Sequence, residues 1–336
     1  MNIEKPLLIK RLWVVSFSLL LVLLAAMFLG LSLGSSQSGI KAVFQNLLGI
    51  GPQDPMLDTI IWKIRFPRIL LATLVGGTLS LGGLVFQAIL KNPLAEPYIL
   101  GISGGSAIGA IIGILMGLVR FPGVSLMAFS GSIGTLLLIL VMSSGHTILK
   151  KDALLLSGVM VNAFCGAVIM FLVSLTQDAR LHNIIFWLMG DLSMVDMPQV
   201  GILAAMLLPC FFLVFWFSNS MNLLLMGKEL AQTMGVNVKA VTVTLLVATS
   251  FMVSATVSYC GLVGFVGLVV PHLLRLLFGP DHRVLVPACV LGGGAYLVFC
   301  DVLARTLPEQ GEMPAGVITA MIGAPLFIYL LKKTRQ

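Results

Sequence analysis

The chain has 336 residues, of which 58% are hydrophobic and only 10% are charged, and its mean hydropathy is +1.07. So few charges could not cover the surface of a soluble domain of this size, so the composition excludes a soluble globular protein and indicates a polytopic membrane protein. The net charge of +7 does not indicate a nucleic-acid partner, because in a membrane protein the placement of Lys and Arg says more than their sum.

About ten apolar stretches are candidates for membrane-spanning helices, each of which needs roughly 20 residues. They lie near residues 12–33, 69–90, 99–118, 124–143, 153–175, 197–217, 240–260, 262–278, 284–304 and 314–331. The first is too long for a signal peptide and ends without a small-residue cleavage site, so we interpret it as a retained helix. The sequence therefore predicts an all-α integral membrane protein with one transmembrane domain over residues 1–336.

The basic residues favour an orientation with both termini in the cytoplasm. With ten spans, thirteen of the 20 Lys and Arg residues fall on the inner side and seven on the outer side. A Gly-rich run, LGGLVFQAILKNP at 81–93, has a loose echo in GLVGFVGLVVPH at 261–272. If the repeated unit has five helices, its two copies must run in opposite directions, so we predict a five-plus-five inverted repeat, a plan common among transporters.

The third apolar stretch carries a glycine at every fourth residue, at Gly101, Gly105, Gly109, Gly113 and Gly117. This spacing predicts a groove along one helix face, in which a neighbouring backbone packs closely. The alternative is that the groove lines a path that needs width. The match of residues 101–105 to the G-x-S-x-G pattern of serine hydrolases carries no weight, because that motif needs a strand-to-helix turn and a catalytic triad.

Residues 222–239, NLLLMGKELAQTMGVNVK, form a polar, helix-forming segment between two long apolar runs. Gly227-Lys228 resembles the end of a phosphate-binding loop, but Glu229 stands where Ser or Thr must hold Mg²⁺. The chain therefore does not bind ATP by that motif, and a partner must bind any ATP and Mg²⁺. We interpret residues 218–239 as a cytoplasmic coupling segment that docks onto a separate ATPase; the alternative is a solvated loop.

Metal and catalytic chemistry find no support in the sequence. The five cysteines lie inside apolar stretches without CxxC spacing, and the four histidines are scattered, so we predict no metal site. Lys63, Arg65 and Arg68, in contrast, form a positive cluster on the outer side, where the orientation rule does not explain it.

Four segments resemble the FecCD-type permeases of ABC importers for iron–siderophore complexes, haem and vitamin B12. They are RFPRILLATLVGGTLSLGGLVFQAILKNPLAEPYILGISGG (65–105), MGKELAQTMGV (226–236), GFVGLVVPHLLRLLFGPDHRVLVP (264–287) and EMPAGVITAMIGAPLFIYLL (312–331). The resemblance implies a homodimer of ten-helix subunits, two ATPase subunits on the cytoplasmic side and a periplasmic or lipoprotein substrate-binding protein on the outer side. It also implies a non-enzymatic subunit of the cytoplasmic (inner) membrane with no cofactor of its own.

The resemblance further implies roles for residues at matching positions. Arg65, Arg68 and Arg305 dock the binding protein as exposed side chains that meet its carboxylates; the alternative is that they anchor helix ends at the lipid headgroups. Asn92 and Leu94 form a cytoplasmic gate, although a plain helix-breaking turn explains this proline-containing segment equally well.

The family's second constriction often has small hydroxyl residues, but Lys151 and Asp152 stand there in this chain, so a gate is not carried over. ATPase coupling is assigned to five residues of the polar segment. They are Gly227, Lys228, Glu229, Ala231 and Gly235.

The sequence thus predicts a permease subunit that moves an iron chelate or cobalamin by alternating access. The alternative is an ion-coupled secondary transporter, which needs a carboxylate or histidine deep in a helix. The best candidate is Asp301, but it lies near the outer end of its span and can pair with Arg305, four residues on.

Overall fold

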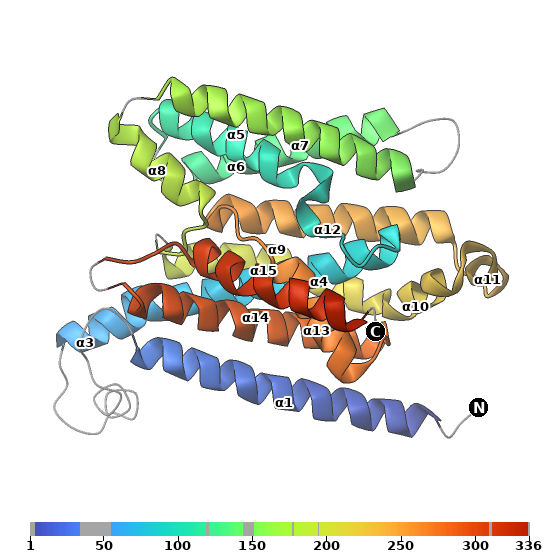
Figure 1. Ribbon diagram of the computed structural model, residues 1–336. Helices are drawn as coiled ribbons and strands as arrows, with labels where there is room; N and C mark the ends of the chain where they lie inside the picture. The colour runs from blue at the N-terminus through green and yellow to red at the C-terminus, as the bar shows by residue number, and fades with distance from the viewer. Residues whose placement is uncertain are drawn as a thin grey trace. The chain divides into compact units, whose positions relative to one another are not determined.

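The computed structural model describes residues 4–33, 55–118, 121–143, 151–176, 178–193, 195–308 and 311–334, and within them the chain is helical, without a β-strand (Figure 1). In chain order the elements are α1 (Glu4–Ser32), α3 (Pro55–Thr59), the π-helix η1 (Ile60–Arg65), α4 (Phe66–Leu90), the 3-10 helix η2 (Pro97–Leu100), α5 (Ile102–Leu115), α6 (Gly123–Ser143), α7 (Lys151–Ser174), α8 (Asp178–Leu188), α9 (Met197–Trp216), α10 (Ser218–Met226), α11 (Lys228–Thr233), α12 (Val238–Cys260), α13 (Val266–Phe278), α14 (His282–Thr306) and α15 (Ala315–Thr334).

Seven helical stretches of the described residues are long and apolar enough to cross a membrane. They are Leu7–Ser32, Pro55–Leu90, Gly123–Met142, Ala153–Ser174, Met197–Trp216, Val238–Cys260 and His282–Thr306. The shorter apolar stretches Ile102–Leu115, Val266–Phe278 and Ala315–Leu330 correspond to the other three predicted spans. The all-helical membrane fold is therefore confirmed, and each predicted span matches an apolar helix.

The contacts of the chain define two compact units. The first contains Met1–Leu81, Leu192–Leu208 and Gly264–Gln336, and the second contains Gly82–Asp191 and Pro209–Val263. This division does not follow two successive sets of five helices, because α13, α14 and α15 belong to the same unit as α1. The inverted repeat stays a prediction.

In the second unit, α5 and α6 pack backbone to backbone. A Cβ atom added to Gly109 would lie 2.1 Å from the carbonyl oxygen of Met127, and one added to Gly131 would lie 2.1 Å from that of Gly105. Side chains larger than hydrogen cannot fit there without a shift of the backbone. The close-packing interpretation of the glycine repeat is therefore confirmed, since α6 fills the groove at these positions.

The first unit contains a similar glycine contact, between α4 and α14. A Cβ atom added to Gly76 would lie 2.1 Å from the carbonyl oxygen of Gly293. The sequence analysis did not single out this second glycine contact, although three consecutive glycines at 292–294 signal it.

Helix α1 also belongs to the first unit and packs along α14. Its residue Arg11 donates a hydrogen bond of 2.5 Å to the carbonyl oxygen of Phe278 at the end of α13.

Candidate functional site

Five charged side chains of the first unit form what we call the arginine cluster: Arg65, Arg68, Arg305, Asp301 and Glu312. Arg68, in the first turn of α4, donates from Nε to Asp301 Oδ1 on α14 at 2.9 Å, and from Nη1 to Glu312 Oε2 in the segment before α15. Asp301 Oδ2 also pairs with Nε of Arg305 at 3.0 Å. One carboxylate therefore binds two guanidinium groups from different helices.

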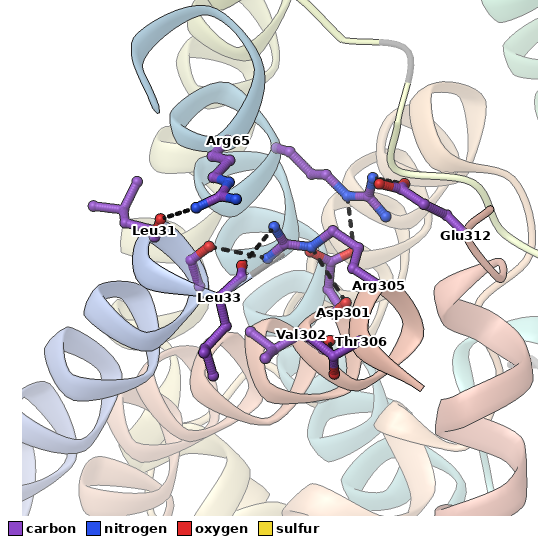
Figure 2. Close-up of polar contacts among 10 residues, drawn as sticks. Leu31, Leu33, Arg65, Asp301, Val302, Arg305, Thr306 and Glu312 are labelled. Carbon is purple, nitrogen blue, oxygen red and sulfur yellow. Dashed lines mark hydrogen bonds and ion pairs between the residues drawn. The ribbon is translucent and has the colours of Figure 1, made fainter. Parts of the chain in front are cut away.

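The remaining donors of the cluster bind the end of α1. Arg65 Nη1 donates to the carbonyl oxygen of Leu31 at 2.6 Å. Arg305 donates to the carbonyl oxygens of Leu33, at 3.3 Å, and Gly30, at 3.2 Å. Figure 2 shows Arg305 between Asp301 on one side and the end of α1 on the other. The last carbonyl groups of a helix lack partners within it, so two arginines satisfy acceptors that the helix leaves open.

The expectation that the three arginines of the cluster are exposed is wrong. Arg65, Arg68 and Arg305 are only 4%, 5% and 3% exposed, whereas Lys63 is exposed. A buried charge needs charged or hydrogen-bonding partners, and the chain supplies them itself. The side chain of Glu312 remains 35% exposed, and the cluster contains one more cation than anion. A role in docking the binding protein stays a prediction, and the partly exposed side chain of Glu312 is the part of the cluster that a partner could reach.

Asp301 was the candidate for an ion-coupling carboxylate. The predicted pair with Arg305 is confirmed, and the sequence analysis missed its second partner, Arg68. Both oxygens of this carboxylate are occupied by buried arginines, and displacing either arginine would leave a buried cation without that partner. This geometry does not suit a group that must exchange a proton or sodium ion in each cycle.

The predicted gate residues lie in the turn that ends α4. Lys91 adopts a left-handed conformation with φ of 50°, and the N–H of Asn92 donates to the carbonyl oxygen of Gln87 at 3.2 Å. The N–H of Leu94 donates to Oδ1 of Asn92 at 2.9 Å. These contacts end the helix by a Schellman motif followed by an Asx turn. They account for Asn92 structurally, and its gating role stays a prediction.

Side chains of the second unit hold the segment that follows this turn. The hydroxyl of Tyr98 donates to the carbonyl oxygen of Val263 at 3.0 Å and accepts from its N–H at 3.1 Å. Asn162 Nδ2 on α7 donates to the carbonyl oxygen of Tyr98 at 3.0 Å. Helix α7 begins at Lys151, but the side chains of Lys151 and Asp152 lie outside the described residues.

Two glycines flank the short helix α11 of the predicted coupling segment, near the start of α12 (Figure 1). Gly227 has φ of 137° and ψ of 153°, a conformation that is essentially restricted to glycine. Gly235 has φ of 84°, and the next residue, Val236, donates to the carbonyl oxygen of Ala231 at 3.0 Å, which closes a Schellman motif. The conformations of these two glycines therefore allow sharp turns on either side of a short helix.

The same segment exposes four large apolar side chains that the sequence analysis did not single out. Leu225 is 40% exposed, Lys228 and Glu229 are also exposed, and Met226, Leu230 and Met234 are 69%, 47% and 59% exposed. Their four-residue spacing was a signal, but the break at Gly227 hides it from a search for one continuous amphipathic helix. Exposed apolar side chains outside the membrane-spanning stretches are typical of interaction surfaces, and the coupling role of this segment stays a prediction.

The fold is that of a multi-pass membrane protein, with apolar spanning helices, a buried ion-paired cluster and an exposed segment between two spans. The sequence profile of the FecCD transport family matches residues 21–333, and the chain belongs to this family.

Two curated relatives and one solved structure agree with this assignment. The chain is 39% identical to the vitamin B12 import system permease protein BtuC of Salmonella arizonae, over 83% of this chain and 84% of the relative. It is 37% identical to the hemin transport system permease protein HmuU of Yersinia pestis, over 95% and 96%. A solved structure described as an inward-facing conformation of a candidate metal-chelate type ABC transporter superposes with a TM-score of 0.84 at 31% identity, over 95% of this chain and 98% of that one. The chain is therefore a permease of an ABC importer.

Proposed function

We propose that this permease carries an iron chelate (a ferric siderophore or haem) or cobalamin inward across the cytoplasmic membrane by alternating access. Two copies form the pathway, two ATPase subunits bind on the cytoplasmic side, and a periplasmic or lipoprotein binding protein delivers the substrate from outside. Both termini lie in the cytoplasm. The chain itself binds neither ATP nor Mg²⁺ and catalyses no reaction. The observation that carries this proposal is the exposed coupling segment within a FecCD family chain.

The coupling segment suits a protein partner better than solvent. Burying the exposed parts of Met226, Leu230 and Met234 on a partner would each contribute up to about 1–2 kcal/mol. Lys228 and Glu229 lie between them and can pair with charges at the rim of such an interface. A solvated loop would have no reason to expose four large apolar side chains outside the spans.

The connection from α11 to α12 is short enough to transmit movement. Only four residues, 234–237, separate the two helices. Gly235 closes α11, and Oδ1 of Asn237 accepts from the N–H of Ala240 at 3.0 Å, which caps the start of α12. A displacement of α11 by an ATPase would therefore reach a membrane-spanning helix directly, as alternating access requires.

The relatives support the substrate class. BtuC is named for vitamin B12 and HmuU for hemin, and both substrates are large tetrapyrrole-derived metal chelates. The proposed pathway needs no tight site for such a ligand, since the binding protein supplies the selection.

The function is tested by uptake into sealed proteoliposomes that contain the permease, its ATPase and the binding protein. Haemin, a ferric siderophore and cyanocobalamin are offered one at a time, with and without ATP and with and without an ionophore. We expect uptake of one of them that requires ATP and survives the ionophore. Uptake that the ionophore abolishes and ATP does not support would instead show an ion-coupled secondary transporter.

The coupling surface is tested by placing the same charge at two positions of α11. Leu230→Asp removes an exposed apolar side chain, and Gln232→Asp, the matched control, changes an exposed polar one. We expect Leu230→Asp to lower ATPase co-purification by at least tenfold and Gln232→Asp to leave it nearly unchanged. Equal retention by both variants would contradict the assignment of this surface.

A further inference from the structure

The second unit contains a cavity of about 130 Å³ at the ends of several membrane helices. Helix α4 ends beside it, at Leu90, and α12 begins beside it, at Val238. Leu154, in the first turn of α7, and the buried side chains of Leu224 and Leu246 also line it. Because three spanning helices begin or end here, the cavity lies at the level of the lipid headgroups rather than in the middle of the bilayer.

Three lysines line the opening of this apolar cavity. Lys91, Lys228 and Lys239 come from the end of α4, the start of α11 and the first turn of α12, and all three are exposed. Among the described residues, no carboxylate forms an ion pair with any of them. The site therefore combines a hydrocarbon-lined floor with a positively charged rim.

We infer that this cavity binds an anionic phospholipid, such as phosphatidylglycerol, with its phosphate at the three lysines and the upper part of an acyl chain on the apolar floor. Basic pockets between membrane helices on the cytoplasmic side have this complementarity to anionic headgroups. The long lysine stems can lie along apolar surface while their ammonium groups reach the phosphate. The lysines and the floor thus recognise the two chemically different parts of one ligand.

Other occupants fit the cavity less well. Free phosphate would use the lysines but gain nothing from Leu154, Leu224 and Leu246. An ATPase subunit would be expected to cover the exposed apolar side chains Leu230 and Met234, yet neither of these lines the cavity. The lipid site and the proposed ATPase surface therefore share only Lys228.

The test uses the purified full-length chain and measures lipid binding by native mass spectrometry. Dioleoyl phosphatidylglycerol is compared with dioleoyl phosphatidylcholine, which has the same acyl chains and no net charge. We expect the anionic lipid to bind at least tenfold more tightly. Lys91→Gln with Lys239→Gln should reduce its affinity roughly 25-fold, or about fivefold for each lysine, and leave phosphatidylcholine binding unchanged. Lys63→Gln, at an exposed lysine of the first unit, is the matched control and should change neither affinity.

A second variant tests the apolar floor. Val243, which also lines the cavity, is partly exposed and has room for a larger side chain. Val243→Phe should fill the cavity and weaken phosphatidylglycerol binding, while thermal unfolding in phosphatidylcholine shows that the variant is folded. Competition by millimolar inorganic phosphate as effective as that by the lipid would overturn the inference. Equal affinity for phosphatidylglycerol and phosphatidylcholine would also overturn it. The same holds if the double lysine variant loses ATPase co-purification but binds phosphatidylglycerol as the wild type does.

Discussion

Two regions of this permease differ in which side chains they bury: one buries charged side chains, and the other exposes large apolar ones. The arginine cluster of the first unit is charged and buried, and its donors bind acceptors from the same chain. The coupling segment of the second unit carries large apolar side chains that are exposed, and neither Gly227 nor Gly235 has an atom within 4 Å of the position of an added Cβ.

This contrast shows that charge alone does not identify a binding surface. The arginines contribute mainly to joining α1, α4 and α14, since a buried cation that loses its partner is strongly destabilising. Leu224 and Ala231 of the coupling segment are buried, but its exposed side chains contribute little to packing within the chain and are available to a partner. Substitutions in the cluster should therefore change folding, and substitutions in the segment should change assembly.

The largest effect is expected from Asp301→Asn. The variant keeps the shape of the side chain but leaves Arg68 and Arg305 without their shared carboxylate. Removing one partner of a buried ion pair destabilises by about 3–5 kcal/mol, so the yield of folded protein and its thermal unfolding temperature should fall sharply. Asp58→Asn, at an exposed aspartate of α3, is the control. Equal unfolding temperatures for the two variants would show that the cluster does not hold the helices together.

A second prediction asks whether substitutions at the α5–α6 contact of the second unit destabilise the protein as substitutions in the arginine cluster do. Gly109→Ala places a Cβ atom 2.1 Å from a carbonyl oxygen of α6, and overpacking of this kind costs about 1–3 kcal/mol. Gly134→Ala, in α6, meets nothing within 4 Å and should be neutral or stabilising by up to about 1 kcal/mol. Thermal unfolding of the two variants measures the difference, and the same loss in both would contradict the contact.

The spans and the glycine contact could be predicted because their signals are local in sequence. Hydropathy over 20 residues identifies a helix, and a four-residue glycine spacing shows which face allows close approach. The ion-pair network could not be predicted in this way, since Asp301 lies 233 residues after Arg68 and Glu312 lies 244 residues after it. The resemblance grouped the three arginines but gave no indication of their burial.

The coupling segment was found from its polarity, but its exposed apolar side chains were not. Its apolar side chains belong to two short helices whose relative direction depends on the unusual backbone of Gly227. Sequence spacing alone does not show how such a turn orients them. The end of α4 is a similar case, because Lys91 takes the left-handed conformation that usually signals glycine.

The coupling segment is tested by Gly227→Val, with Gly201→Val in α9 as the control. An added Cβ atom meets nothing within 4 Å at either position, but only Gly227 has a positive φ, of 137°. The strain of forcing a β-branched residue into this conformation is about 1–3 kcal/mol, enough to reorient α11. We expect loss of ATPase co-purification for Gly227→Val, with little change in the unfolding temperature of the membrane helices. Wild-type ATPase activity in this variant would mean that the turn does not position the docking helix.

The smallest effect is expected at Glu312, where the contrast between the two regions is least sharp. Charge reversal at Arg68 would test docking poorly, because it would bury a carboxylate next to Asp301 and unfold the protein. Glu312→Gln instead changes the one cluster member whose side chain is substantially exposed. It raises the net charge of the cluster by one, while Asp301 still holds both arginines.

If acidic residues of the binding protein dock here, the affinity of the binding protein for the permease should rise up to roughly fivefold at low salt. This gain corresponds to the about 0–1 kcal/mol of an exposed ion pair, and it should fade at high salt. Binding of the purified binding protein to the reconstituted complex at two salt concentrations measures this change. An unchanged or lower affinity at low salt, in a variant that unfolds at the wild-type temperature, would leave the arginine cluster with a structural role alone.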